Sequence, residues 1–370
     1  MNDEHKTFTI FSIFWIILGW LGFISAILGF FYTPVFAIYA ISGIGGGIYW
    51  LVKKRHSPFP KGRNEEGFLK TNGKKLAYDR IAILLILFFV IIFSIFTTPT
   101  IFSGRDQGSI SEAAIRLSQN HQLEFSFPAS NEFFKIYGPG KALNFPGFYY
   151  QENGNLITQF PVPYISWLAI FYSIFGLSGF IIANAVLFFI FALSFYFLFK
   201  IYTSQKYALF SLFMIFTSFL FSWIFKFTLS ENMALALVWL VILEIMLFIK
   251  KPCALNYYPL LATLGLLFFT RIEGVLFLIT ALIIIFLIKN TREYLTHEKG
   301  WQKIILPLIV FGLVFILNFE KNFPFYQEII KALFHSKEIG LGTKDLIYKS
   351  YTLKIFSLYG AKSFHQAVLV

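Results

Sequence analysis

A series of long apolar runs constrains this chain more than any other feature of its sequence. The first run, Phe8–Phe31, is long enough to cross the roughly 30 Å hydrocarbon core of a bilayer as a helix. Of the 370 residues only 14% are charged, whereas a soluble domain carries about a quarter. So little charge does not cover a surface that faces water. The sequence therefore predicts an all-α, polytopic membrane protein.

The basic residues indicate topology rather than a nucleic-acid partner. The net charge is +12, but most Lys and Arg lie in short loops between apolar runs, where they orient a membrane protein. We therefore predict membrane lipids as partners and no nucleic acid. Cys253 is the only cysteine, and the six His residues show no spacing typical of metal ligands. No cofactor is predicted, and a divalent metal is left open.

The lengths of the apolar runs predict about nine spanning helices. We assign them to Phe8–Phe31, Val35–Val52, Ile81–Phe102, Phe180–Phe199, Tyr207–Trp223, Met233–Ile249, Leu255–Thr270, Val275–Ile288 and Leu306–Phe319. A further apolar run, Pro163–Phe175, rises only about 20 Å as a helix, so we predict that it lies in the outer interface of the membrane.

Charge between the spans predicts their direction. The loop Lys53–Arg80 contains nine Lys or Arg and is therefore predicted to be cytoplasmic. The following 58-residue segment, Ser103–Phe160, is then extracytoplasmic. We accordingly divide the chain into residues 1–80, a hairpin with the basic loop; residues 81–319, the main membrane module with its outer loop 103–160; and residues 320–370, an extracytoplasmic helical tail.

The outer loop carries signals of local structure. Ser109 and Glu112 have the spacing of a capping box and apolar residues follow at helical spacing, so Ser109–Asn120 is predicted to be an amphipathic helix on the membrane surface. Arg116 is placed to pair with Glu112 across one helical turn. The Asn-Gly pair in Glu152–Asn155 predicts a β-hairpin. A long loop with this much structure is expected to have a function.

These features together resemble the C superfamily of glycosyltransferases, membrane enzymes that use polyprenyl-phosphate sugars and include protein O-mannosyltransferases and the lipid A aminoarabinose transferase. The resemblance covers residues 81–289: a span, an acidic residue opening a long outer loop, juxtamembrane helices and a helical bundle. The pieces that match are Gly104-Arg105-Asp106, Phe160-Pro161-Val162-Pro163-Tyr164 ahead of Phe175-Gly176, Leu229-Ser230-Glu231 and Thr270-Arg271-Ile272-Glu273-Gly274.

The resemblance implies a plasma-membrane enzyme that moves a sugar, with inversion, from a polyprenyl-phosphate donor to an extracytoplasmic lipid, glycan or protein acceptor. Asp106 matches the acidic residue that takes a proton from the acceptor hydroxyl. Arg271 resembles the basic residue that holds the lipid phosphate, and Glu231 the acidic residue that opens a later span. Arg105, whose charge favours an ionised Asp106, and Lys141 complete the substrate-binding candidates.

Each assignment has a plainer alternative. Asp106 alternatively ends its span and anchors it at the interface, Arg271 pairs with Glu273 at a turn, and Glu231 caps a helix. Lys141 is otherwise a solvated lysine. For the whole chain, the alternatives are a transporter or flippase of lipid-linked glycans and a non-catalytic membrane scaffold.

Overall fold

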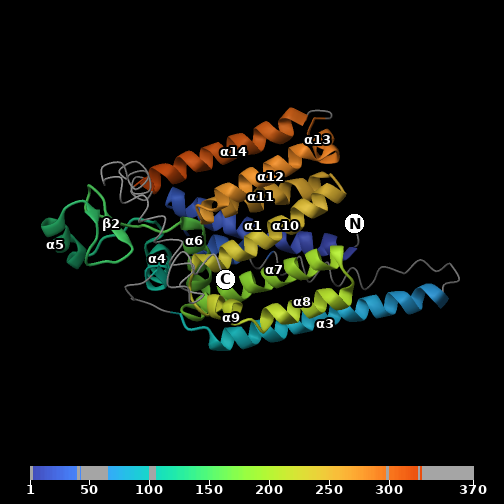
Figure 1. Cartoon of the computed structure of the whole chain (residues 1–370). Coiled ribbons are helices and arrows are strands. Elements are labelled where there is room, and N and C mark those ends of the chain that lie inside the picture. Colours follow the sequence, from blue (N-terminus) through green and yellow to red (C-terminus); the bar gives the residue numbers. More distant parts are fainter. Residues whose placement is uncertain are drawn as a thin grey trace, which may run out of the picture. The chain divides into compact units, whose positions relative to one another are not determined.

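The computed structural model describes residues 3–39, 42, 66–99, 106–296, 300–323 and 326. Within these residues the chain is predominantly helical (Figure 1). Its elements are α1 (Asp3–Leu28), a helix at 33–39, α3 (Glu66–Phe96), α4 (Asp106–Asn120), α5 (Pro128–Tyr137), β1 (Gly140–Lys141), β2 (Phe148–Tyr150), β3 (Leu156–Thr158), α6 (Val162–Phe175), α7 (Ser178–Tyr202), α8 (Gln205–Phe216), α9 (Phe219–Lys226), α10 (Ser230–Lys250), α11 (Ala254–Thr270), α12 (Gly274–Leu287), α13 (Lys289–Thr296) and α14 (Gly300–Lys321).

Among the described residues, five helices are long and apolar enough to cross a membrane: α1, α3, α7, α10 and α14. They coincide with five of the nine predicted spans, and the chain is a helical membrane protein. The other four spans stay predictions. Helices α11 and α12 have 17 and 14 residues, and α12 meets α13 at 89°. Most of Val35–Val52 lies outside the described residues.

Helices α7 and α10 form the centre of the bundle. Their most apolar windows are 72% and 61% buried, compared with 11% in α3. Their packed faces are aromatic: Phe191 of α7 stacks on Phe221 of α9 at 5.4 Å and contacts Trp239 of α10 at 6.2 Å. Helix α3 instead exposes Leu84, Phe88, Ile91 and Ile95 at helical spacing. An exposed apolar stripe of this kind suits contact with lipid.

Two predicted boundaries are wrong. The segment Tyr207–Trp223 is not one continuous helix, because α8 ends at Phe216 and α9 starts at Phe219. Between them the Thr217 hydroxyl donates to the Phe213 carbonyl at 3.2 Å, and Ser218 has extended backbone. Such local hydrogen bonds compete with helix continuation. Helix α3 begins within the predicted loop Lys53–Arg80.

Side chains of α7 hold α3 near the start of its apolar run. Asp79, near the predicted start of the span, accepts hydrogen bonds from Lys200 at 2.8 Å and from the Tyr196 hydroxyl at 2.6 Å. Both partners belong to the last turns of α7. These bonds fix α3 to α7 at Asp79, and the helix begins further back, at Glu66. Figure 1 shows this end of α3 opposite the end of the bundle that carries α5 and the strands.

The predicted outer loop folds into a small lobe of α4, α5 and a three-stranded antiparallel sheet of order β1-β2-β3. These short strands are the only sheet among the described residues, and the fold is otherwise helical, as predicted. The predicted hairpin is confirmed: β2 pairs with β3, with Tyr149 opposite Ile157, and Gly154 in its turn has φ +82°. The sheet forms because Phe148, Tyr149 and Tyr150 are all buried against the lobe.

Helix α6 lies between this lobe and the bundle. It packs against α4, α1 and α7, and the ten residues from Val162 to Phe171 are buried. Gly179 permits the sharp turn into α7, since a Cβ there would lie 2.2 Å from the Phe171 carbonyl oxygen. Helix α6 is too short to be a candidate span.

The chain divides into two compact units, Met1–Asn318 and Phe319–Val370. The first unit contains all the candidate site residues. In the second, Phe319 stacks on Tyr326 at 5.1 Å. The predicted helical tail 320–370 lies outside the described residues except for 320–323 and 326.

Candidate functional site

Asp106 is the first residue of α4, and its side chain is exposed. The sequence placed the start of this helix at Ser109, which is wrong: Ser109 lies inside the helix, and its hydroxyl donates to the Pro146 carbonyl at 2.7 Å. Ser109 is therefore not a cap. No described residue forms an ion pair with it. Arg105, its predicted neighbour, lies outside the described residues.

The first turn of α4 is bound to the bundle through Thr228, in the short linker between α9 and α10. The Thr228 hydroxyl donates to the Gln107 carbonyl at 3.0 Å and lies 2.7 Å from the Ser111 hydroxyl. Ser111 also reaches the Gln107 carbonyl, at 2.8 Å. Thr228 and Ser111 are both fully buried. Thr228 therefore holds Gln107, the residue after Asp106, and Thr228 itself lies three positions before Glu231.

Buried amides hold the same linker from inside the bundle. The Phe227 carbonyl accepts hydrogen bonds from Asn184 at 3.1 Å and from Asn232 at 2.8 Å. The Tyr164 hydroxyl of α6 donates to Asn184 at 2.8 Å, and burial raises the pKa of this phenol, which stays a donor. Helices α7 and α10 therefore meet at one carbonyl, and α6 joins them through Asn184.

Arg271 ends α11, opposite the start of α10. It contacts Glu231 at 2.6 Å, and it binds both oxygens of Glu273 at 3.0 Å through Nε and Nη2. Its hydrogen bonds to Glu273 and the charge of Glu231 raise its own pKa, and the same hydrogen bonds lower the pKa of Glu273. The Ser230 hydroxyl accepts a longer bond from Nη1 at 3.5 Å.

The charge balance of this cluster limits what Arg271 can bind. One guanidinium faces two carboxylates, so the group of three carries a net charge of about −1 near neutral pH. Contacts to Glu231 and Glu273 occupy three of the five N–H donors of the guanidinium. The side chain of Arg271 is still 29% exposed. A phosphate oxygen can reach the remaining donors only at this open side.

The described site residues thus fall into two groups. Glu231 and Arg271 are in direct contact, and Asp106 joins them at the same end of the bundle through Gln107 and Thr228. Lys141 is exposed on β1 of the lobe and forms no ion pair with a described residue. Arg105 belongs to neither group because it is not described. The described residues contain no cluster of three metal-ligating His, Cys, Asp or Glu.

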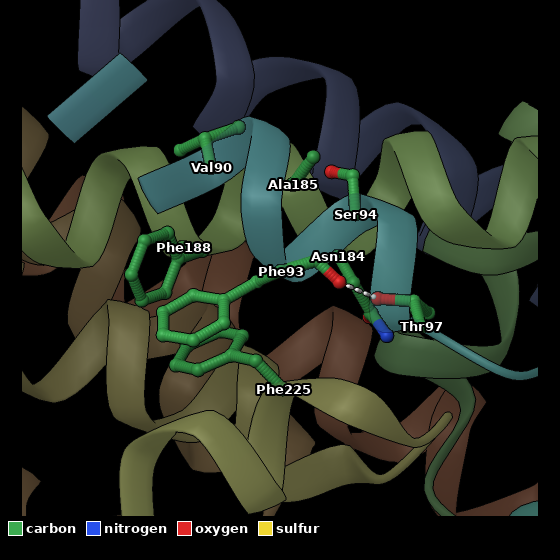
Figure 2. A pocket seen from close by; sticks show the side chains of 8 residues that line it. All are labelled: Val90, Phe93, Ser94, Thr97, Asn184, Ala185, Phe188 and Phe225. Carbon is green, nitrogen blue, oxygen red and sulfur yellow. Dashed lines mark hydrogen bonds between the residues drawn. The ribbon is translucent and has the colours of Figure 1, made fainter. Parts of the chain in front are cut away.

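A narrow crevice lies between α3, α7 and α9, behind the polar network (Figure 2). Figure 2 shows Thr97 and Asn184 together at one side of it and Phe93, Phe188 and Phe225 at the other. It has room for about one water molecule. It is therefore too small for a sugar, and it borders the polar network only at Asn184.

Sequence reasoning missed the residues that build the framework: Thr228, Asn184, Asn232 and Tyr164. One signal was present, since Asn184 is an amide inside the apolar run Phe180–Phe199 and polar groups at membrane depth need partners. Nothing in the sequence singles out Thr228 from the other hydroxyl residues of the chain.

Comparisons with known proteins add no identification: no family model, no curated protein and no solved structure matches this chain. The resemblance to C-superfamily glycosyltransferases therefore rests on the sequence pieces that carry it.

Proposed function

We propose that this protein is a membrane glycosyltransferase that moves a sugar from a polyprenyl-phosphate donor to a hydroxyl acceptor outside the cell membrane. The observation that carries the proposal is the position of Asp106. Its exposed carboxylate starts a helix that is hydrogen-bonded through Thr228 to the end of the bundle where Glu231 and Arg271 meet. A base and a cation are the two groups that this transfer requires.

The features at the two ends of the helical bundle support an extracytoplasmic position of the site. The lobe with Asp106 and the polar start of α3 lie at opposite ends of the bundle (Figure 1). That start of α3 belongs to the basic segment that the positive-inside rule assigns to the cytoplasm. Asp106, Glu231 and Arg271 then face the extracytoplasmic side, where a lipid-linked sugar presents its head group.

In the proposed reaction Asp106 accepts the proton of the acceptor hydroxyl while the acceptor oxygen attacks the anomeric carbon of the sugar. The bond between that carbon and the phosphate oxygen breaks, and the polyprenyl phosphate leaves with the electron pair. The open side of Arg271 binds the departing phosphate, and Glu231 accepts hydrogen bonds from sugar hydroxyls. Attack opposite the phosphate inverts the anomeric centre, which NMR of the product would reveal.

The test uses membranes that contain the protein and a radiolabelled polyprenyl-phosphate sugar. Asp106→Asn removes the base but keeps the shape of the side chain, and we expect transfer to fall by about 100-fold or more. Glu132→Gln is the matched control, because it removes a carboxylate from an exposed surface pair in the same lobe. Its transfer should equal that of the unchanged protein.

Each other result has a defined meaning. Undiminished transfer by Asp106→Asn would remove Asp106 as the base. Absence of transfer by every variant, with movement of the labelled lipid between leaflets, would favour the transporter or flippase. Absence of both activities would favour the scaffold.

A further inference from the structure

The linker between α9 and α10 is hydrogen-bonded on both sides. Its Thr228 binds α4, the helix that begins with Asp106, and its Phe227 accepts from Asn232 at the start of α10. Its three residues, Phe227, Thr228 and Leu229, are extended at both ends, as the backbone of Phe227 (φ −112°, ψ 160°) and Leu229 (φ −115°, ψ 140°) shows. We propose that Thr228 is the positioning residue that sets Asp106 relative to the Glu231–Arg271 ion pair. This inference rests on the function proposed above.

The first argument is the closed triangle of oxygens at Thr228. The Gln107 carbonyl, the Ser111 hydroxyl and the Thr228 hydroxyl are separated by 2.8, 2.7 and 3.0 Å. The two hydroxyls supply two protons for three contacts, so each proton can fill one of them while the carbonyl always accepts at least one. Loss of the Thr228 hydroxyl removes two sides of the triangle and leaves only the contact within α4.

The second argument is that the linker is rigid on the bundle side. Asn184 and Asn232 both donate to the carbonyl of Phe227, directly before Thr228. Thr98, which follows α3, donates its backbone N–H to the Lys226 carbonyl at 3.2 Å. A hydroxyl attached to such a fixed backbone can hold the first turn of α4 in place.

The third argument is burial. Thr228 is fully buried, so it cannot touch substrate and acts only through the groups that it binds. Helix α4 also packs along α6, and this packing does not involve the Thr228 hydroxyl. We therefore expect removal of the hydroxyl to leave the helix folded and to loosen its first turn, which begins with Asp106.

The variants are Thr228→Val, which keeps the shape and removes the hydroxyl, and Thr228→Ser, which keeps the hydroxyl. Thr291→Val is the control. Thr291 is equally buried in α13, and its hydroxyl donates to the carbonyls of Ile285 and Ile288. It lies beyond the end of α12 that is opposite Arg271. If the valine variant fails to accumulate, Thr228→Ala replaces it.

The first measurement is amide hydrogen exchange of residues 106–112, which does not depend on activity. We expect exchange to become about tenfold faster in Thr228→Val and to stay unchanged in Thr228→Ser and Thr291→Val. Unchanged exchange in Thr228→Val would overturn the inference, whether or not the protein transfers sugar.

The second measurement is the kinetics of sugar transfer. We expect Thr228→Val to lower kcat by about tenfold or more and to change KM by less than about threefold, because a small displacement of a base affects the chemical step. In an Asp106→Asn background the same substitution should cause no further loss. An equal loss in both backgrounds would show a structural role only.

These results separate the two proposals. Full activity of Asp106→Asn would contradict Asp106 as base, while the exchange data would still decide whether Thr228 holds the first turn of α4. Loss of activity in Asp106→Asn together with unchanged kcat in Thr228→Val would contradict the positioning role alone.

Discussion

Arg271 and Glu231 form a 2.6 Å ion pair although they are forty positions apart in the sequence. Glu231 lies in the first turn of α10 and Arg271 follows the last turn of α11, so each charge complements the dipole of its own helix. The pair joins two adjacent helix ends at the site. It also ties the only cation of this cluster to a carboxylate, and the predictions below follow from this geometry.

The guanidinium group of Arg271, with its several N–H donors, is predicted to be essential for sugar transfer. Arg271→Lys keeps the charge but cannot bind Glu273 through two nitrogens and Glu231 through a third, so we expect kcat/KM for the lipid-linked donor to fall by about 10- to 100-fold. Arg116→Lys is the control, since Arg116 also pairs with a glutamate, Glu112, at 2.8 Å. It should lower the stability of the lobe and leave KM unchanged. Equal kinetics for Arg271→Lys and the unchanged protein would show that the cluster is structural.

The stability of the unit that carries the site should depend on pH through Glu273. Its pKa is lowered from 4.5 by hydrogen bonds from Arg271. A lowered pKa in the folded state adds stability above the unfolded value, and this stability is lost as the pH falls through the lowered pKa. Glu273→Gln should therefore unfold at a lower temperature than the unchanged protein near pH 7. The difference should shrink as the pH falls below 4.5 and vanish below the lowered pKa of Glu273.

Thermal unfolding in detergent at several pH values measures this effect. Glu132→Gln is the charge-matched control, because the Glu132–Lys135 pair lies on the surface with both side chains about 70% exposed. A difference between Glu273→Gln and the unchanged protein that grew as the pH fell would contradict the prediction.

Gly147 is predicted to fix the segment before β2 onto α4. It has φ +89°, and a Cβ there would lie 2.5 Å from the Cβ of Ser109. Gly147→Ala should therefore cost about 1–3 kcal/mol from the backbone conformation alone and more from the contact with Ser109. We expect faster cleavage of the lobe by trypsin, for example after Lys141.

Gly138→Ala is the control for that measurement. Gly138 also has a positive φ, +67°, but nothing lies within 4 Å of the added Cβ. The difference in cleavage rate between the two variants isolates the contact with Ser109. Equal rates would show that this contact is not important for the stability of the lobe.

The sequence predicted the local features of the chain because their causes are local. Apolar length identified the five long helices, and the Asn-Gly pair identified the hairpin between β2 and β3. The ion pair between Glu112 and Arg116 is confirmed for the same reason, since residues four apart are neighbours on any helix. Glu231 and Arg271 were named as candidates, but their contact with each other was not predicted.

The tertiary structure decided which distant groups meet. Thr228 and Gln107 are 121 positions apart, and their hydrogen bond depends on how α4 packs beside the linker between α9 and α10. Likewise α3 extends to Glu66 with Asp79 held by Lys200, 121 positions away. The sequence by itself determined a helical membrane protein with a structured loop. A long apolar helix suits the hydrocarbon of a membrane without any specific partner residue. The hydrogen bonds that hold the helix of Asp106 could be read only from the fold. A buried hydroxyl or amide needs a partner, and tertiary packing decides which carbonyl it binds.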